Sequence, residues 1–231
     1  MDKPNHHSRS TLLKASALNT SRLLLLGGGG HGQVLLDIGN RCGLHFDGVL
    51  DPQLEIGTLI GPSTVIGSDS LLDTLVPSET NLVLGVGLGI DLENRLLIAL
   101  KYEKRGFSFP TVIAKSATIS DNSSISSEGV QAFERTVIQV NAVIDSHAVL
   151  NTGAIIEHDV KIGRGSFIGP GSILCGGAQI GEFVMVGSGA VILPQIQVGD
   201  GSTIGAGAVV VQNVPSRTRV IGVPAKELKS K

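Results

Sequence analysis

The chain has 231 residues, 42% of them hydrophobic and 16% charged, which is enough apolar material for a buried core in one large domain or two smaller ones. Its 18 basic and 20 acidic side chains leave a net charge of −2, so no long-range field attracts nucleic acid or anionic lipid. No apolar run reaches the roughly 18 to 20 residues of a membrane span. We therefore expect neither a nucleic-acid-binding protein nor a membrane protein.

The balance of small and aromatic residues is unusual. There are 31 glycines and no tryptophan, and aromatic residues make up only 3% of the chain. Such a balance favours a repeating β architecture. The two cysteines, Cys42 and Cys175, are far apart and form neither a disulfide framework nor a zinc cluster. We expect a reducing, cytoplasmic location.

The chain begins with a polar, unpatterned stretch. Residues 1–21 contain no recognisable signal sequence and are expected to form a flexible tail. Residues 22–108 alternate strand patterns with helical ones, which predicts a βαβ beginning and about half of a doubly wound fold. The expected strands are 22–26, 46–50 and 81–86, and the expected helices are 27–38 and 91–105.

The turn between the first strand and the first helix is rich in glycine. It satisfies the spacing G-x-G-x-x-G at Gly27, Gly29 and Gly32, and Asp51 follows nineteen residues after Gly32. Glycines let a phosphate approach backbone N–H groups at a helix N-terminus, and an acid at this separation is typical of a ribose contact. Three interpretations stay open: a nicotinamide dinucleotide site, a site for another nucleotide, and a turn that only connects two elements. The short length of the unit favours a single nucleotide.

The rest of the chain repeats every six positions. Thirteen successive slots hold Ile, Leu or Val, and the residue four positions beyond a slot is mostly small. The distance from Ile125 to Ile138 is one residue more than two hexads, which predicts an inserted residue or a bulge near 128–135. The thirteen slots are Ile138, Ile144, Leu150, Ile156, Ile162, Ile168, Leu174, Ile180, Val186, Ile192, Val198, Ile204 and Val210.

This repeat resembles that of the hexapeptide-repeat acyltransferases. The resemblance implies a left-handed parallel β-helix over residues 109–231, with three hexads in each triangular coil and a C-terminal cap. The closing segment 220–226 also matches the Gly-x-Pro-Ala-Lys ending of those enzymes. The expected fold is thus an α/β, Rossmann-like half-domain followed by a left-handed β-helix.

Acetyl transfer requires a base for the proton of the nucleophile, and histidine suits this task because its ordinary pKa lies near neutrality. The register of the repeat puts His158 and Asp159 outward at a coil edge, where the carboxylate would orient the imidazole. One coil further, Gly176 would leave room for a thioester beside the ring. The alternative for His158 is an exposed turn histidine. His147 is expected on a solvated face.

The glycine turn, the Gly-Val-Gly at 85–87 and the hexads together resemble the sialic acid O-acetyltransferase-like group of sugar acyltransferases, which includes acetyltransferases of nucleotide-linked amino sugars. The resemblance implies His158 as the general base with Asp159 beside it, acetyl-CoA as co-substrate, no metal, and a homotrimer with its sites between subunits. The implied substrate contacts are Gly29, Gly30, His31, Asp51 and Gly87. The implied acetyl-CoA contacts are Phe167, Gly176, Ser188 and Ala206.

The expected function is therefore acetylation of the amino group of a nucleotide-activated sugar, for surface glycan biosynthesis. O-acetylation and non-catalytic binding of a sugar nucleotide stay open as alternatives, and the sugar and base are not specified. Phe167 stands where some members have a histidine that contacts the acyl carrier, so that hydrogen bond is not expected here. We expect the trimer to cover outward apolar residues such as Phe167, Leu193 and Val209, and the N-terminal unit and the segment after Val214 to cap the two ends.

Overall fold

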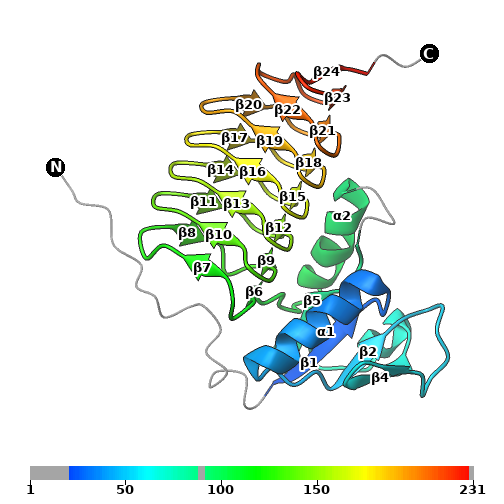
Figure 1. The fold of residues 1–231 in the computed structure, drawn as a ribbon. Helices are drawn as coiled ribbons and strands as arrows, with labels where there is room; N and C mark the ends of the chain where they lie inside the picture. Colours follow the sequence, from blue (N-terminus) through cyan, green and yellow to red (C-terminus); the bar gives the residue numbers. More distant parts are fainter. Residues whose placement is uncertain (1–20, 88–91, 229–231) are drawn as a thin grey trace.

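The computed structural model describes residues 21–87 and 92–228, which form two units (Figure 1). A small α/β unit comes first, and a triangular stack of short strands follows and rises away from it. Residues 1–20 of the expected tail lie outside the described residues, as does position 91 at the start of the second expected helix. No described helix combines the length and apolar character needed to cross a membrane.

The N-terminal unit is a five-stranded sheet in the order β3-β4-β2-β1-β5, parallel except for the β3–β4 pair. Strand β1 lies between β2 and β5 and carries a run of four buried leucines, as a parallel strand covered on both faces does. The elements are β1 (Arg22–Leu26), α1 (Gly30–Cys42), β2 (Gly48–Leu50), β3 (Leu59–Ile60), β4 (Ser63–Gly67), β5 (Thr80–Leu84) and α2 (Leu92–Glu103), with 3₁₀ turns η2 (Asp69–Asp73) and η3 (Pro77–Glu79).

All three expected strands and both expected helices are present in this unit. Strands β3 and β4 were not expected, because Gly57, Gly61 and Pro62 interrupt the apolar residues of that segment. Both strands lie at one edge of the sheet, where β4 pairs with β2. The carboxyl end of β1 leads directly into the glycine turn and α1, so the expected βαβ beginning is confirmed.

The second unit is a parallel β-helix of the left-handed kind that hexapeptide repeats form, which confirms the expected fold class. Its strands before Arg219 are two residues long and turn through three sheets, so each pairs with a strand about one coil away, as Ile138 does with Ile156. We call the three sheets the domain face, the aliphatic face and the polar face.

The domain face contains β6 (Val112–Ile113), β9 (Gln131–Ala132), β12 (Val149–Leu150), β15 (Phe167–Ile168), β18 (Met185–Val186) and β21 (Thr203–Ile204), followed by β23 (Arg219–Ile221) and β24 (Lys226–Glu227). The aliphatic face contains β7 (Thr118–Ile119), β10 (Val137–Ile138), β13 (Ile155–Ile156), β16 (Ile173–Leu174), β19 (Val191–Ile192) and β22 (Val209–Val210). The polar face contains β8 (Ser124–Ile125), β11 (Val143–Ile144), β14 (Lys161–Ile162), β17 (Gln179–Ile180) and β20 (Gln197–Val198).

The repeat builds the interior of the triangle. The Ile, Leu or Val slots are buried and stack coil upon coil, as Ile156, Leu174 and Ile192 do. The residue four positions beyond a slot is mostly small and lies buried at the end of a corner turn, with half-buried Ile196 as the exception. The expected insertion is present, since the inward residues of β8 and β9 are seven positions apart instead of six, and Gly129 within it adopts a left-handed φ of 66°.

The N-terminal unit covers the domain face of the β-helix. Leu35 and Leu36 of α1 belong to one buried cluster with Val149 and Phe167 of the domain face. We expected a neighbouring subunit to cover Phe167, and this was wrong. The residue is only 4% exposed because the chain covers it itself. The unit therefore packs along a side of the β-helix as well as near its first coil, and β23 and β24 close the other end (Figure 1).

The three faces differ in what they turn outward. The outward residues of the first four strands of the domain face are buried, whereas the polar face shows Lys161, Gln179 and Gln197 to solvent. The aliphatic face presents a column of half-buried β-branched side chains in register from coil to coil. They are Val137, Ile155, Ile173, Val191 and Val209. Of the three faces, only this one is both apolar and uncovered by the described residues of the chain.

Candidate functional site

The first candidate site is the corner turn 157–160, which joins β13 on the aliphatic face to β14 on the polar face; we call it the base corner. His158 and Asp159 lie in it with side chains 57% and 54% exposed. The Nδ1–H of His158 donates a hydrogen bond of 2.7 Å to Oδ2 of Asp159. Because the carboxylate accepts at Nδ1, the neutral ring keeps a free electron pair on Nε2.

The backbone and one further side chain hold the carboxylate in place. Asp159 has a left-handed φ of 61°, a conformation that a short polar side chain tolerates and a coil corner requires. Asn141, one coil earlier, donates from Nδ2 to Oδ1 of Asp159 over 3.0 Å. The hydrogen bonds from His158 and Asn141 lower the pKa of Asp159, so the acid is ionised where the imidazole needs an acceptor.

Gly176 lies one coil above the imidazole of His158. A Cβ atom at this position would be 2.5 Å from Nε2 of His158, so any other residue would displace the ring. The same corner contains Gly177, with a φ of 70°. The two glycines leave the Nε2 edge of the imidazole without a side chain above it from that coil.

The second candidate site is a cleft of about 290 Å³ between the N-terminal unit and the β-helix, which we call the junction cleft. Its lining residues are Gly30, His31, Val34, Gly87, Phe133, Asn151, Thr152 and Phe167. It brings together three of the implied substrate contacts with Phe167 from the implied acetyl-CoA contacts. Asn151 and Thr152 lie in the turn from β12 to β13, so the cleft is at the edge between the domain and aliphatic faces.

The glycines of the turn at the N-terminus of α1 are of two kinds, those that the backbone requires and those that it does not. Gly27 has a φ of 97°, and a Cβ on Gly32 would collide with the carbonyl oxygen of Gly27. Gly29 and Gly30 are different, because a Cβ on either would meet no described atom within 4 Å. The fold therefore does not itself require glycine at positions 29 and 30, and the space before the helix N-terminus is open for an anionic group.

Asp51 stabilises this glycine turn through hydrogen bonds to the backbone. Its Oδ2 accepts a 2.8 Å hydrogen bond from the N–H of Gly28, and its Oδ1 accepts one of 2.8 Å from the N–H of Gln53. Both oxygens are thus engaged with backbone at the carboxyl end of β2. The structure gives this acid a role in shaping the glycine turn, and the ribose contact that its sequence position suggested stays a prediction.

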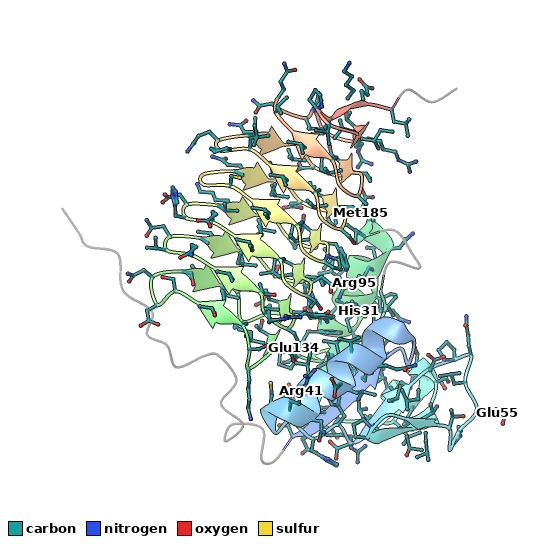
Figure 2. The ribbon with its side chains drawn as sticks, in the orientation of Figure 1. His31, Arg41, Glu55, Arg95, Glu134 and Met185 are labelled. Atoms are coloured by element: carbon teal, nitrogen blue, oxygen red, sulfur yellow. The ribbon has the colours of Figure 1, made fainter. Side chains whose placement is uncertain are left out.

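Behind the cleft lies a buried polar network that the sequence patterns did not indicate. Gln131 accepts at Oε1 from Nε2 of His31 over 2.8 Å and from a guanidinium nitrogen of Arg95 over 3.2 Å. Arg95 is 1% exposed and also donates to the carbonyls of Val86 and His147. Burial lowers the pKa of Arg95 to about 10, which leaves it charged at neutral pH. Figure 2 shows His31 and Arg95 between the helices and the stacked strands.

His147 was expected on a solvated face, and this was wrong. The residue is 2% exposed, and its Nε2 lies 2.8 Å from Oε1 of Glu103 at the end of α2. Burial lowers the pKa of His147, against the opposing effect of Glu103. The repeat correctly predicted that the side chain of His147 points away from the core of the β-helix. Helix α2 covers that corner, however, and the hexad pattern contains no information about a covering helix.

The implied acetyl-CoA contacts divide between two edges of the β-helix. Ser188 and Ala206 lie in consecutive turns from the domain face to the aliphatic face, and Phe167 lies just before the same edge. Gly176 lies at the other edge of the aliphatic face, with the base corner. Within one chain the aliphatic face thus separates the junction cleft from His158. Among the described residues, no cluster of three or more His, Cys, Asp and Glu side chains is arranged to hold a metal ion.

A β-helix of hexapeptide repeats with an exposed imidazole–carboxylate pair at a coil corner defines the class of the hexapeptide-repeat transferases. Residues 177–212 match the family described as bacterial transferase hexapeptide, and residues 22–96 match the PglD N-terminal domain. The two matches thus fall on the two units of the chain, one on each.

Solved structures resemble this chain over nearly its whole length. GDP-perosamine N-acetyltransferase from Caulobacter crescentus, solved with CoA and GDP-perosamine, is 30% identical over 91% of this chain and 98% of its own, with a TM-score of 0.85. The acetyltransferase domain of PglB from Neisseria gonorrhoeae, solved with acetyl coenzyme A, is 32% identical over 90% of this chain and 100% of its own, with a TM-score of 0.83. WeeI from Acinetobacter baumannii shares the fold at 20% identity, with a TM-score of 0.65.

This chain belongs to the family of hexapeptide-repeat sugar acetyltransferases that carry a PglD-type N-terminal domain.

Proposed function

We propose that this enzyme transfers the acetyl group of acetyl-CoA to the amino group of a nucleotide-activated amino sugar. The observation that carries the proposal is the full-length likeness to acetyltransferases whose structures contain CoA, acetyl-CoA or GDP-perosamine. The junction cleft supports it, since open space at a helix N-terminus suits the diphosphate of a sugar nucleotide. Cys42 and Cys175 are free thiols, which suit the reducing cytoplasm as the location of the reaction.

In the proposed reaction His158 is the general base. The amine nitrogen attacks the thioester carbonyl, Nε2 of His158 takes the proton from that nitrogen, and the new C–N bond replaces the C–S bond. The proton then passes from the imidazolium to the departing thiolate, which leaves as CoA. Asp159 keeps Nδ1 protonated and stabilises the transient positive charge.

The proposed site is shared between subunits of a homotrimer. His158 lies across the aliphatic face from the junction cleft, and the aliphatic column Val137 to Val209 needs a cover. If the aliphatic faces of neighbouring subunits pack together, the base corner of one subunit comes beside the cleft of the next. We place the acetyl-CoA along the edge marked by Phe167, Ser188 and Ala206, next to the partner's His158.

The substrate is identified by a thermal-shift screen of UDP-, GDP-, dTDP- and CMP-sugars, amino and non-amino, because a ligand of the native state raises its melting temperature. Release of free CoA thiol with the best ligand, together with the mass of the product, then tests the reaction. We expect one added acetyl group on an amino sugar. Stabilisation by NAD without thioester cleavage would contradict the proposal.

The shared site is tested by mixing defective subunits. Co-expressed His158→Ala and Gly29→Val chains should regain activity, since roughly a quarter of the composite sites would receive an intact base and an intact cleft. Analytical ultracentrifugation should give a mass near three chains, and Ile173→Glu should reduce it. A fully active monomer, or no recovery in mixed trimers, would contradict the shared geometry.

A further inference from the structure

The junction cleft contains a single titratable side chain among its described lining residues, His31. The other lining residues are glycine, apolar, or neutral amide and hydroxyl side chains. A histidine in such a cleft can offer a bound molecule either a hydrogen-bond donor or an acceptor, depending on which ring nitrogen carries the proton. Its partner in the protein decides which.

The orientation of the Gln131 amide settles the position of that proton. Nε2 of Gln131 donates to the carbonyl oxygen of Leu84 over 2.9 Å, which turns Oε1 toward His31 and Arg95. A guanidinium can only donate, so the Arg95 contact independently requires oxygen at that end of the amide. Oε1 therefore accepts from Nε2–H of His31, and the neutral ring has its electron pair on Nδ1.

Nδ1 of His31 faces the part of the cleft beside Gly87. A Cβ on Gly87 would lie 2.9 Å from Cβ of His31, so glycine keeps this side of the histidine clear. Among the described residues, Nδ1 has no hydrogen-bond partner. The ring of Phe133, with centroids 5.1 Å apart, supports the imidazole from the β-helix side. Burial, with Arg95 as the nearby charge, lowers the pKa of His31 to about 4, so the ring is neutral at physiological pH.

A neutral Nδ1 electron pair repels a phosphate oxygen and attracts a hydroxyl hydrogen. We propose that His31 binds a hydroxyl group of the sugar nucleotide through Nδ1, and that Gln131 is the positioning residue that keeps this nitrogen an acceptor. The phosphates then depend on the backbone around Gly29 and Gly30, not on the imidazole. This inference rests on the proposed function and assigns the chemistry of one contact within it.

Two substitutions of His31 test the contact. Asparagine places an amide oxygen near the position of Nδ1, whereas leucine removes the acceptor. With the sugar nucleotide selected by the screen, measured by calorimetry, His31→Leu should weaken binding about tenfold, the effect of one lost hydrogen bond. His31→Asn should keep most of the affinity. Acetyl-CoA binding should not change, and His45→Leu, which removes an exposed histidine, is the matched control.

The variant Gln131→Glu tests whether His31 contacts a hydroxyl or a phosphate of the sugar nucleotide, because the two contacts predict opposite changes in affinity. A glutamate still accepts from Arg95 and His31, gives up the donation to Leu84, and raises the pKa of His31, which favours a proton on Nδ1. The summed charge of the three groups stays at +1, because the new carboxylate offsets the imidazolium. Our proposal expects weaker binding of the sugar nucleotide, whereas a phosphate contact would give tighter binding and would overturn it.

Nuclear magnetic resonance of ¹⁵N-histidine-labelled protein gives a readout independent of binding. His31, assigned by comparison with His31→Asn, should show a protonated Nε2 and an unprotonated Nδ1 at neutral pH. The opposite tautomer would overturn the proposal even if Gln131→Glu does not fold. If the wild type cleaves acetyl-CoA with a sugar nucleotide and His31→Leu binds that sugar nucleotide equally well, only this inference fails. If no sugar nucleotide binds the wild type, the proposed function fails with it.

Discussion

The base corner and the junction cleft each present one histidine, and the two are built in opposite ways. His158 is exposed and is paired with the carboxylate of Asp159, whereas His31 is largely buried and is paired with the amide of Gln131. An ionised partner favours a ring that gains a proton during a reaction, and a neutral partner in a buried place favours a ring that stays neutral. We therefore expect the role of each histidine in this fold to follow from its burial and from its hydrogen-bond partner.

The largest effect is expected from removing the base. His158→Ala should lower kcat by about 10²- to 10⁴-fold, because it removes the imidazole that takes the proton in the proposed reaction, while acetyl-CoA affinity stays nearly unchanged. Steady-state kinetics and calorimetry on the folded variant check this. Near-normal turnover would end the assignment of His158 and, with it, the contrast between the two histidines.

The next largest effect is expected at the glycine turn. Gly29 has an ordinary φ of −66° and open space around it, so the fold should tolerate Gly29→Val, whereas a bound phosphate should not. We expect the affinity for the sugar nucleotide to fall by about 10²-fold, with unchanged melting temperature and unchanged acetyl-CoA binding. Unaltered sugar-nucleotide binding would show that the phosphates lie elsewhere.

A third prediction concerns the pH dependence of stability, which should depend on His31. Its pKa falls from 6.5 to about 4 on folding, so between these values the unfolded chain binds a proton that the folded chain does not. Stability should therefore be lost as the pH falls from 6.5 to 4, by roughly 3 kcal/mol for this group, and the lowered pKa of His147 acts in the same direction. Thermal unfolding across this range should show a shallower slope for His31→Leu than for the wild type, and equal slopes would contradict the burial argument.

The smallest effect is expected from Asn141, which acts on His158 only through Asp159. Asn141→Gly removes the amide while keeping the left-handed φ of 59° unstrained, and kcat should fall about three- to tenfold with little change in KM. Arg217→Gly, at another corner with a φ of 57°, is the control and should leave kcat unchanged. If both variants behave alike, the carboxylate does not need its second hydrogen bond.

Much of this architecture could be predicted because it is periodic. Every sixth residue from 138 to 210 is buried inside the β-helix. The register of the repeat correctly predicted that His158 and Asp159 lie at a coil corner. The glycine spacing correctly predicted that a helix begins at this turn, because such a turn depends on the conformational freedom of the local backbone. The pairing of His158 with Asp159 was also predictable, because the two residues are neighbours in the chain.

The contacts between the two units could not be predicted in this way. Gln131 lies where the six-residue period is interrupted, so the repeat predicted no role for it. Nothing in the sequence of its helix distinguished Arg95 from an ordinary exposed basic residue. His147 and Phe167 point outward by register, yet the N-terminal unit covers both. Hydrophobic periodicity reports which side of an element faces its own core, and it contains no information about a second unit that packs on the outside.

The sequence by itself thus determined the β-helix, the glycine turn and the base corner, because each depends on residues that lie within one coil or one turn of each other. Only the tertiary structure decided that the glycine turn faces the domain face, that the junction cleft and His158 lie at opposite edges of the aliphatic face, and that His31 is held as a neutral acceptor. These features join residues about a hundred positions apart, such as His31 and Gln131. Their chemistry comes from burial and from partners that only packing brings together.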